Sequence, residues 1–214
     1  MLEADLLQVS SGSRIGLLGG SFNPAHAGHI HISVLSMQLL ALDQVWWLVS
    51  PQNPLKPMAG MAPLAERLEG ARQTAAGHAI IATDIEQHLR TRFTADTLIG
   101  LRQKFPDGRF VWLMGADNLS GIDRWERWQQ VFESVPIAVF ARPGYTENAE
   151  NAKASRHFAR YRLDSTRAHE LADMSPPVWV FLKTPENPLS ATNIRAGREH
   201  PDATVNSNSK GIKP

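Results

Sequence analysis

The sequence predicts an α/β protein built on an open, doubly wound parallel sheet with helices on both faces. Two features support this prediction. Short apolar segments alternate along the chain with longer segments in which apolar residues recur at helical spacing. The apolar segments are also continuous, as expected for parallel strands that are covered on both faces. Sheets of this kind bind their ligands beyond the carboxyl ends of the strands, so we expect functional residues to follow the strands.

The predicted strands are short apolar segments bounded by glycine, proline or polar residues. They comprise residues 14–19, 45–49, 80–82, 109–114, 137–140 and 178–182. The predicted helices lie between them, and several begin near a proline or a side chain suited to capping. They comprise residues 28–42, 63–76, 94–104, 125–132 and 190–199, with Thr94 and Ser190 as N-caps and residues 51–63 as a loop. Strands that alternate with helices in this way are typical of a Rossmann-like fold.

The chain length of 214 residues fits one domain, to which we assign residues 1–200. Residues 145–177 are polar and weakly periodic, which predicts a partly helical decoration of this domain. Residues 201–214 lack apolar content, which predicts a mobile tail.

Composition and charge argue against several classes of function. The formal net charge is +1 and no basic stripe carries interleaved aromatic residues, which disfavours a nucleic-acid partner. The absence of cysteine excludes disulfides, iron–sulfur clusters and thiolate zinc sites. No apolar run reaches the roughly 18 residues of a membrane span, and the acidic N-terminus does not resemble a secretory signal. We therefore expect a cytoplasmic protein with no membrane partner.

Residues 19–29 form a glycine-rich loop between a predicted strand and a predicted helix. The glycines let the backbone approach a ligand closely, and the free N–H groups and dipole of the new helix favour an anion. His26 and His29 are three residues apart at the start of the helix, where both imidazoles can face one phosphate group. An imidazole there can donate a hydrogen bond to phosphate oxygens as charge builds in a transition state.

Other interpretations of this loop are a different nucleotide-binding motif, a structural turn or a metal site. It matches neither GxGxxG nor a Walker loop, which disfavours a dehydrogenase or a P-loop NTPase. A structural glycine turn with two surface histidines is one alternative. A metal site built on His26 and His29 is another, but no third ligand stands nearby in the sequence.

The run Gly19-Gly20-Ser21-Phe22-Asn23-Pro24-x-His26-x-Gly28-His29 closely resembles the GG(S/T)F(D/N)PxHxGH signature of bacterial nicotinate-nucleotide adenylyltransferases. These enzymes belong to the HxGH nucleotidyltransferase superfamily, and the resemblance continues with further motifs to about residue 198. It implies that His26 and His29 are catalytic and that Asn23 contacts the acceptor substrate. The ATP-binding residues that it implies in this loop are Gly19, Gly20, Ser21, Phe22, His26, Gly28 and His29.

Two basic motifs resemble further phosphate contacts of the family. Residues 190–195, Ser-Ala-Thr-Asn-Ile-Arg, resemble its (S/I)S(S/T)xxR element, which implies that Ser190, Thr192 and Arg195 bind the β- and γ-phosphates of ATP. An ordinary capped surface helix is the alternative. Lys56 stands where the family often has Pro-Pro-His-Lys, but Leu55 replaces the histidine. Lys56 is a candidate phosphate ligand of the acceptor, or else a solvated loop lysine.

Four further elements concern the rest of the ligand. Residues 92–97 resemble the family's (S/R/T)YTxxT element with Phe93 in place of tyrosine, and the helix start at Thr94 implies a site for a nicotinate carboxylate. Asp117 lies in a GxD-like element that implies contacts with nucleotide hydroxyls. Trp125 stands where the family stacks a tryptophan on the pyridine ring, although helix packing is the alternative. Arg142, in an RPGY turn, either reaches a phosphate or braces the turn.

The reaction implied by the resemblance is adenylyl transfer from ATP to nicotinate mononucleotide. The products are nicotinate adenine dinucleotide and pyrophosphate, in NAD biosynthesis, and Mg²⁺ accompanies the ATP without a dedicated carboxylate cluster. Rival acceptors are nicotinamide mononucleotide, phosphopantetheine or a cytidylyl acceptor. A non-catalytic nucleotide-binding module is the alternative from another class. A homo-oligomer is compatible with the sequence but not predicted by any pattern in it.

Overall fold

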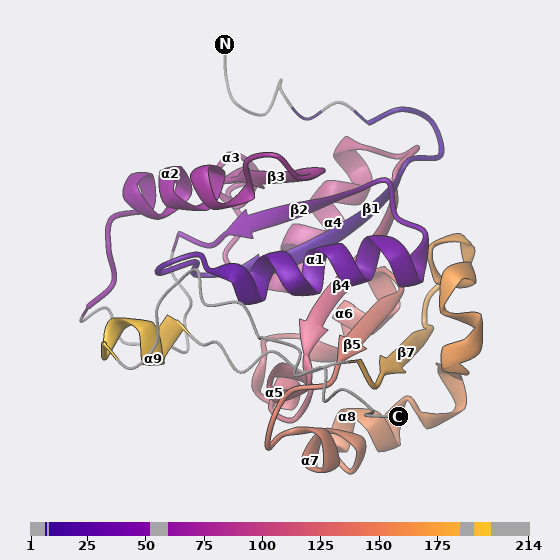
Figure 1. Ribbon diagram of the computed structural model, residues 1–214. Coiled ribbons are helices and arrows are strands. Elements are labelled where there is room, and N and C mark those ends of the chain that lie inside the picture. Colours follow the sequence, from indigo (N-terminus) through magenta and orange to yellow (C-terminus); the bar gives the residue numbers. More distant parts are fainter. Residues whose placement is uncertain (1–6, 8, 52–59, 185–190, 198–214) are drawn as a thin grey trace, which may run out of the picture.

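The computed structural model describes residues 7, 9–51, 60–184 and 191–197. Their centre is a seven-stranded sheet in the order β3-β2-β1-β4-β5-β7-β6, and every pair of neighbouring strands is parallel. Figure 1 shows the helices packed around this sheet. The strands are β1 Arg14–Gly20, β2 Gln44–Val49, β3 Ile80–Thr83, β4 Arg109–Gly115, β5 Ile137–Phe140, β6 Arg162–Leu163 and β7 Trp179–Leu182. The Rossmann-like α/β fold predicted from the sequence is confirmed.

The α-helices agree with the predicted ones in place but not in every boundary. They are α1 Ala27–Leu40, α2 Leu64–Ala75, α3 Ile85–His88, α4 Thr94–Lys104, α5 Ala116–Leu119, α6 Trp128–Ser134, α7 Thr146–Glu150, α8 Lys153–His157 and α9 Ala191–Arg195. Helix α1 ends at Leu40 rather than at residue 42, because Ala41 adopts a left-handed conformation with φ of 52°. Its N–H group donates to Met37 O and closes the helix.

Two predictions about helix starts are wrong. Helix α6 begins at Trp128, not at Trp125, because Trp125 is extended and Arg127 adopts a left-handed conformation with φ of 51°. Thr94 is not the N-cap of α4 but its first helical residue. Phe93 holds the cap position, and no side chain caps this helix. The first turn of α4 therefore keeps its backbone N–H groups free of a side-chain cap.

The hydrophobic core has two layers, one on each face of the sheet. Alternate strand residues enter opposite layers, as Leu17 and Leu18 of β1 do. One layer packs against α1, α2 and the 3-10 helix Ser165–Asp173, and the other against α3 to α6 and α8. The sequence predicted Trp46, Trp47, Trp112 and Trp179 to be packing residues, and all are buried in these layers.

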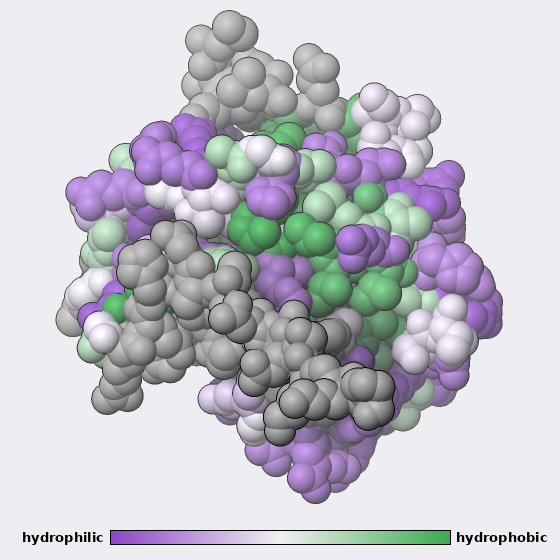
Figure 2. Space-filling view, in the orientation of Figure 1, coloured by the Kyte–Doolittle hydropathy of each residue, from purple (hydrophilic) through white to green (hydrophobic). Residues whose placement is uncertain are grey.

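Helix α1 buries two serines together with Leu40 against the sheet. Ser33 and Ser36 are fully buried, and the Ser33 hydroxyl donates to His29 O and accepts a hydrogen bond from Trp47 Nε1, both at 2.8 Å. Apolar side chains such as Val34 and Leu39 remain partly or fully exposed. Figure 2 shows hydrophobic residues gathered on the face that α1 occupies in Figure 1. The helical spacing of apolar residues predicted the helix and its buried Leu40, but it did not predict that Ser33 and Ser36 are buried as well.

Residues 145–177 are more than a helical decoration. They contain α7, α8 and two 3-10 helices, but also β6, which pairs with β7 and forms one edge of the sheet. A two-residue strand with one exposed side chain leaves no periodic signal in the sequence. Residues 201–214, the predicted tail, lie outside the described residues. Among the described helices, none combines the length and the apolar character that crossing a bilayer requires.

Candidate active site

The glycine-rich loop lies where the sequence analysis expects it, between the carboxyl end of β1 and the N-terminus of α1 (Figure 1). Gly19 allows the loop to lie directly against the core. A Cβ atom at this position would lie 2.4 Å from Cη2 of Trp112, well inside van der Waals contact. The next residues turn sharply, and Phe22 adopts a left-handed conformation with φ of 45°. We call residues 19–29 the HxGH loop.

His26 and His29 form a reciprocal cap at the start of α1. His26 is the N-cap, and its Nδ1 accepts a hydrogen bond from Gly28 N at 3.1 Å. His29 Nδ1 accepts from His26 N at 3.2 Å, so each ring satisfies a backbone donor of the helix start. The ring centroids are 3.8 Å apart. Because both Nδ1 atoms accept hydrogen bonds, each neutral imidazole carries its proton on Nε2, where it can donate to an anionic ligand.

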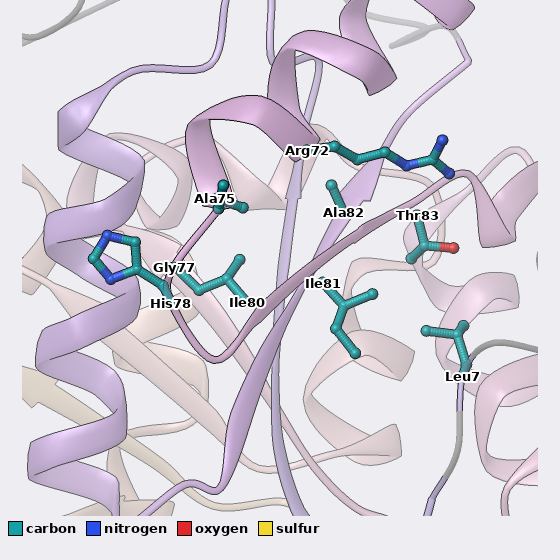
Figure 3. Close-up of a pocket in the computed structure, with 10 residues that line it drawn as sticks. Leu7, Arg72, Ala75, Gly77, His78, Ile80, Ile81, Ala82 and Thr83 are labelled. Atoms are coloured by element: carbon teal, nitrogen blue, oxygen red, sulfur yellow. The ribbon is translucent and has the colours of Figure 1, made fainter.

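A cavity of about 300 Å³ opens at the carboxyl ends of the strands beside this loop. Several residues that the sequence predicted for the ligand line it together: Gly19, Gly20, Ser21, Thr94 and Trp125. Residues that the sequence analysis missed also line it, among them Ser50, Glu86, Arg92, Asn118 and Arg124. A second cavity, of about 340 Å³, lies beside edge strand β3 and contains none of the predicted site residues (Figure 3).

Trp125 is half-buried at the wall of the first cavity. It lies between the 3-10 helix Ile122–Arg124 and α6, in extended backbone, and it packs against one layer of the core. Within the described residues it forms no aromatic ring pair with another side chain. Its position at the cavity wall therefore suits an aromatic ligand ring.

Glu86 is a buried carboxyl group at the base of this cavity, on α3 directly after β3. Burial raises its pKa to about 7, and hydrogen bonds from Thr97 and Ser50 oppose the rise. Thr97 Oγ1 lies 3.3 Å from Glu86 Oε1 and 2.9 Å from Thr91 Oγ1. An acidic side chain three residues after a strand end was the sequence signal that would have found it. A half-neutral carboxyl group keeps the cavity from being strongly negative near neutral pH.

The raised pKa of Glu86 predicts a dependence of stability on pH. The folded state binds this proton more tightly than the unfolded chain, so the stabilisation is complete below about pH 4.5 and is lost as the pH rises through about 7. Glu86→Gln remains neutral. We expect the free energy of unfolding of the wild type to fall by up to about 3 kcal/mol relative to this variant between about pH 5 and pH 9. Urea denaturation at a series of pH values measures this, and parallel curves for the two proteins would refute it.

Asp117 and Arg142 form an ion pair next to the carboxyl end of β4. Arg142 Nη1 donates to Asp117 Oδ2 at 2.9 Å, so Arg142 braces this carboxylate. Asp117 Oδ1 is buried and accepts no hydrogen bond from the described residues. Gly115 leaves room for it, since a Cβ atom there would lie 2.4 Å from Oδ1. The pair thus leaves one buried acceptor, Oδ1, without a hydrogen-bond partner among the described residues.

Helix α9 brings the C-terminal motif to the HxGH loop. Arg195 donates to the backbone carbonyl of Asn23, and its Nη2 lies 3.4 Å from Thr192 Oγ1. Both α9 side chains are exposed, whereas Asn23 is buried and hydrogen-bonds to Gly60 O and Ala62 N. Ser190 and Lys56, the other two predicted phosphate contacts, lie outside the described residues.

The structure offers no dedicated metal site in the part of the chain that it describes. No group of three or more histidine or acidic side chains is close enough to hold an ion there. His26 and His29 instead direct their Nδ1 atoms at backbone N–H groups. A metal centre built on this histidine pair, which the sequence left as an alternative, has no support from this geometry.

The fold and the site define a class of protein: a Rossmann-like α/β protein with a paired-histidine loop at the carboxyl edge of its sheet. The sequence matches the cytidylyltransferase-like family over residues 17–197. A curated relative from Parvibaculum lavamentivorans, named "probable nicotinate-nucleotide adenylyltransferase", is 49% identical over 187 residues, which are 87% of this chain and 93% of the relative. A relative of the same name from Cereibacter sphaeroides is 52% identical over 182 residues, 85% of this chain and 96% of its own. The chain belongs to the cytidylyltransferase-like family, in its group of nicotinate-nucleotide adenylyltransferases.

A solved structure shares the fold. The nicotinic acid mononucleotide adenylyltransferase of Plasmodium falciparum, solved in complex with NaAD, superposes with a TM-score of 0.64 at 15% identity. The match covers 89% of this chain and 86% of the Plasmodium chain. At this identity the likeness supports the fold alone. The resemblance inferred from the HxGH loop is confirmed by the family and its curated members.

Proposed function

We propose that the protein transfers the adenylyl group of ATP to nicotinate mononucleotide. The observation that carries this proposal is the HxGH loop, which packs at the carboxyl edge of the sheet with its two imidazoles in contact and with Arg195 bonded to it from the far end of the chain. This arrangement gathers N–H donors and a guanidinium around one anionic centre. The names of the curated relatives agree with this reaction.

In the proposed reaction a phosphate oxygen of the mononucleotide attacks the α-phosphorus of ATP. The new oxygen–phosphorus bond forms as the bond from the α-phosphorus to the bridging oxygen breaks, and pyrophosphate leaves with that bond's electron pair. No protein nucleophile is needed, so catalysis rests on positioning and charge stabilisation. His26 and His29 are the proposed donors to the α-phosphate oxygens. Thr192 and Arg195, with Ser190, are the proposed ligands of the leaving pyrophosphate.

The cavity beside the loop is the proposed acceptor site. Trp125 would stack on the pyridine ring, and the uncapped N–H groups at the start of α4, beside Thr94, would bind the ring carboxylate. Arg92 and Arg124, which also line the cavity, add positive charge next to it. Asp117 is the proposed contact of a ribose hydroxyl of ATP, and Arg142, which donates to its Oδ2, would hold it in place. Asn23 and Lys56 are the remaining proposed contacts of the acceptor.

Mg²⁺ is proposed as a companion of ATP rather than a resident ion. Because the described residues hold no cluster of three ligating side chains, phosphate oxygens and water would supply most of its ligands. It would neutralise the triphosphate. The substrates are metabolites of the cell interior, and the cytoplasm is the proposed location.

A label in the α-phosphate of ATP tests the reaction. With nicotinate mononucleotide and Mg²⁺, we expect one labelled nicotinate adenine dinucleotide for each pyrophosphate released, as separated by chromatography. Release of labelled AMP without dinucleotide would contradict adenylyl transfer, and tight ATP binding with no product would favour a non-catalytic nucleotide-binding module.

A further inference from the structure

Arg67 is a buried arginine beneath the HxGH loop that no part of the proposed mechanism uses. It lies on α2 and is only 4% exposed. Its guanidinium donates to four backbone carbonyl groups. They are Ala62 O at 2.8 Å from Nε, Ser21 O at 2.7 Å and Ser50 O at 2.8 Å from Nη1, and Pro51 O at 3.0 Å from Nη2.

These contacts join the carboxyl ends of two neighbouring strands. The β1–β2 ladder ends where Ser50 N donates to Gly20 O at 2.9 Å. Beyond this point the segments that follow β1 and β2 diverge. Their next carbonyl groups would need a hydrogen bond from water or from another donor. Arg67 supplies that donor to both segments, so a single side chain on α2 joins the HxGH loop to Ser50 and Pro51, which follow β2.

The charge of Arg67 has no acidic partner among the described residues. No aspartate or glutamate there forms an ion pair with it. Burial alone lowers its pKa from the usual value, although an arginine so placed remains protonated at neutral pH. Burying a charge without a counter-ion costs free energy. Because Arg67 is adjacent to the proposed triphosphate site, binding of the anion would offset this cost.

The bond to Ser21 O also orients the loop. In a planar trans peptide the C=O and the following N–H point in opposite directions. Because the Ser21 carbonyl points toward Arg67, the Phe22 N–H points toward the other side of the loop. No hydrogen bond of the described residues uses this N–H. Phe22 itself is held at a positive φ of 45°, a strained conformation that persists only where its surroundings enforce it.

We infer that Arg67 is a positioning residue for the triphosphate of ATP. It clamps Ser21 and Ser50 so that the Phe22 N–H faces the phosphates, and it places a positive charge beneath them. This inference rests on the proposed function in taking the HxGH loop as the triphosphate site. It concerns binding of the phosphates and not the identity of the acceptor.

Two variants of Arg67 separate positioning from folding. Arg67→Lys keeps the charge with fewer donors in a different geometry, and Arg67→Met removes both. Arg102→Met is the matched control, because Arg102 also donates to a backbone carbonyl, Ser134 O at 2.9 Å, but does so from α4 away from the loop. Circular dichroism and thermal unfolding report whether each variant is folded.

Calorimetric titration with ATP and with adenosine then measures how much of the affinity depends on the phosphates. We expect Arg67→Met to weaken ATP binding at least about tenfold while adenosine binding changes by less than about twofold, with Arg67→Lys in between. Arg102→Met should bind both as the wild type does. Equal loss for ATP and adenosine, unchanged ATP affinity, or an Arg67→Lys chain that does not fold would each overturn the inference, since they assign Arg67 to general stability or to no role.

These titrations need no acceptor substrate, so they are independent of turnover. If the wild type binds ATP but transfers nothing to nicotinate mononucleotide, the proposed function fails while the role of Arg67 is still measured. If transfer proceeds and the Arg67 variants bind ATP normally, the role of Arg67 fails while the proposed function stands.

Discussion

Replacing His29 with alanine is expected to lower kcat by roughly 100- to 1000-fold, as loss of one preorganised donor to a transition-state anion typically does. His29 lies at the third helical position of α1, where its Nδ1 accepts a hydrogen bond from His26 N, and its Nε2 is the proposed donor to the α-phosphate. Steady-state turnover with ATP and nicotinate mononucleotide measures the effect. Binding of ATP should weaken far less than turnover, because the donor acts as charge builds.

The same substitution also removes a capping hydrogen bond, so a second variant separates the two roles. Glutamine is a standard partner at this position of a capping box, and His29→Gln keeps an acceptor for His26 N while removing the imidazole. We expect His29→Gln to melt near the wild-type temperature and to turn over nearly as slowly as His29→Ala. His31→Ala, on the same helix, is the control for histidine loss. Near-normal turnover of both His29 variants would remove this residue from the mechanism.

Trp125→Ala is expected to raise the KM for the mononucleotide by about ten- to a hundredfold, the range found when an aromatic platform for a base is removed. The KM for ATP should change little, because Trp125 lines the proposed acceptor cavity and makes no ring contact with His26 or His29. Trp125→Phe keeps an aromatic face and should recover part of the affinity. Initial rates at varied mononucleotide and saturating ATP provide the test.

An unchanged KM for the mononucleotide in Trp125→Ala would show that this tryptophan only packs against the core. Equal increases in both KM values would show a general disturbance of the cavity. Trp125 follows the 3-10 helix Ile122–Arg124 and lies two residues before the left-handed Arg127. Its backbone position depends on these local elements, which Trp125→Ala leaves unchanged.

Much of this architecture could be predicted because its sequence signals are local. The apolar runs of β1, β2 and β4 are continuous, since both faces of the sheet are covered, and the HxGH loop is contiguous in sequence. Its internal hydrogen bonds span two or three residues, so the motif carries its own geometry.

The remaining features depend on contacts between distant segments. Arg67 resembles any charged residue of an amphipathic helix until α2 packs against Ser21 and Ser50, and the hydrogen bonds of Glu86 come from Thr97 and Ser50, which are distant in sequence. The start of α6 was misplaced because the left-handed turn at Arg127 has no glycine or asparagine to mark it. A periodicity argument does not find the buried serines of α1, because Ser33 is buried through its hydrogen bonds to His29 O and Trp47 Nε1.

The most direct test of the proposed activity compares two acceptors that differ only in the ring substituent. Pyrophosphate release is measured with ATP and Mg²⁺ at equal concentrations of nicotinate mononucleotide and nicotinamide mononucleotide. The negative carboxylate should bind at the uncapped start of α4, in the cavity that Arg92 and Arg124 also line, so we expect kcat/KM to favour the nicotinate form by at least about a hundredfold. Equal rates would contradict the carboxylate site at Thr94, and no release with either acceptor would contradict adenylyl transfer to a pyridine mononucleotide.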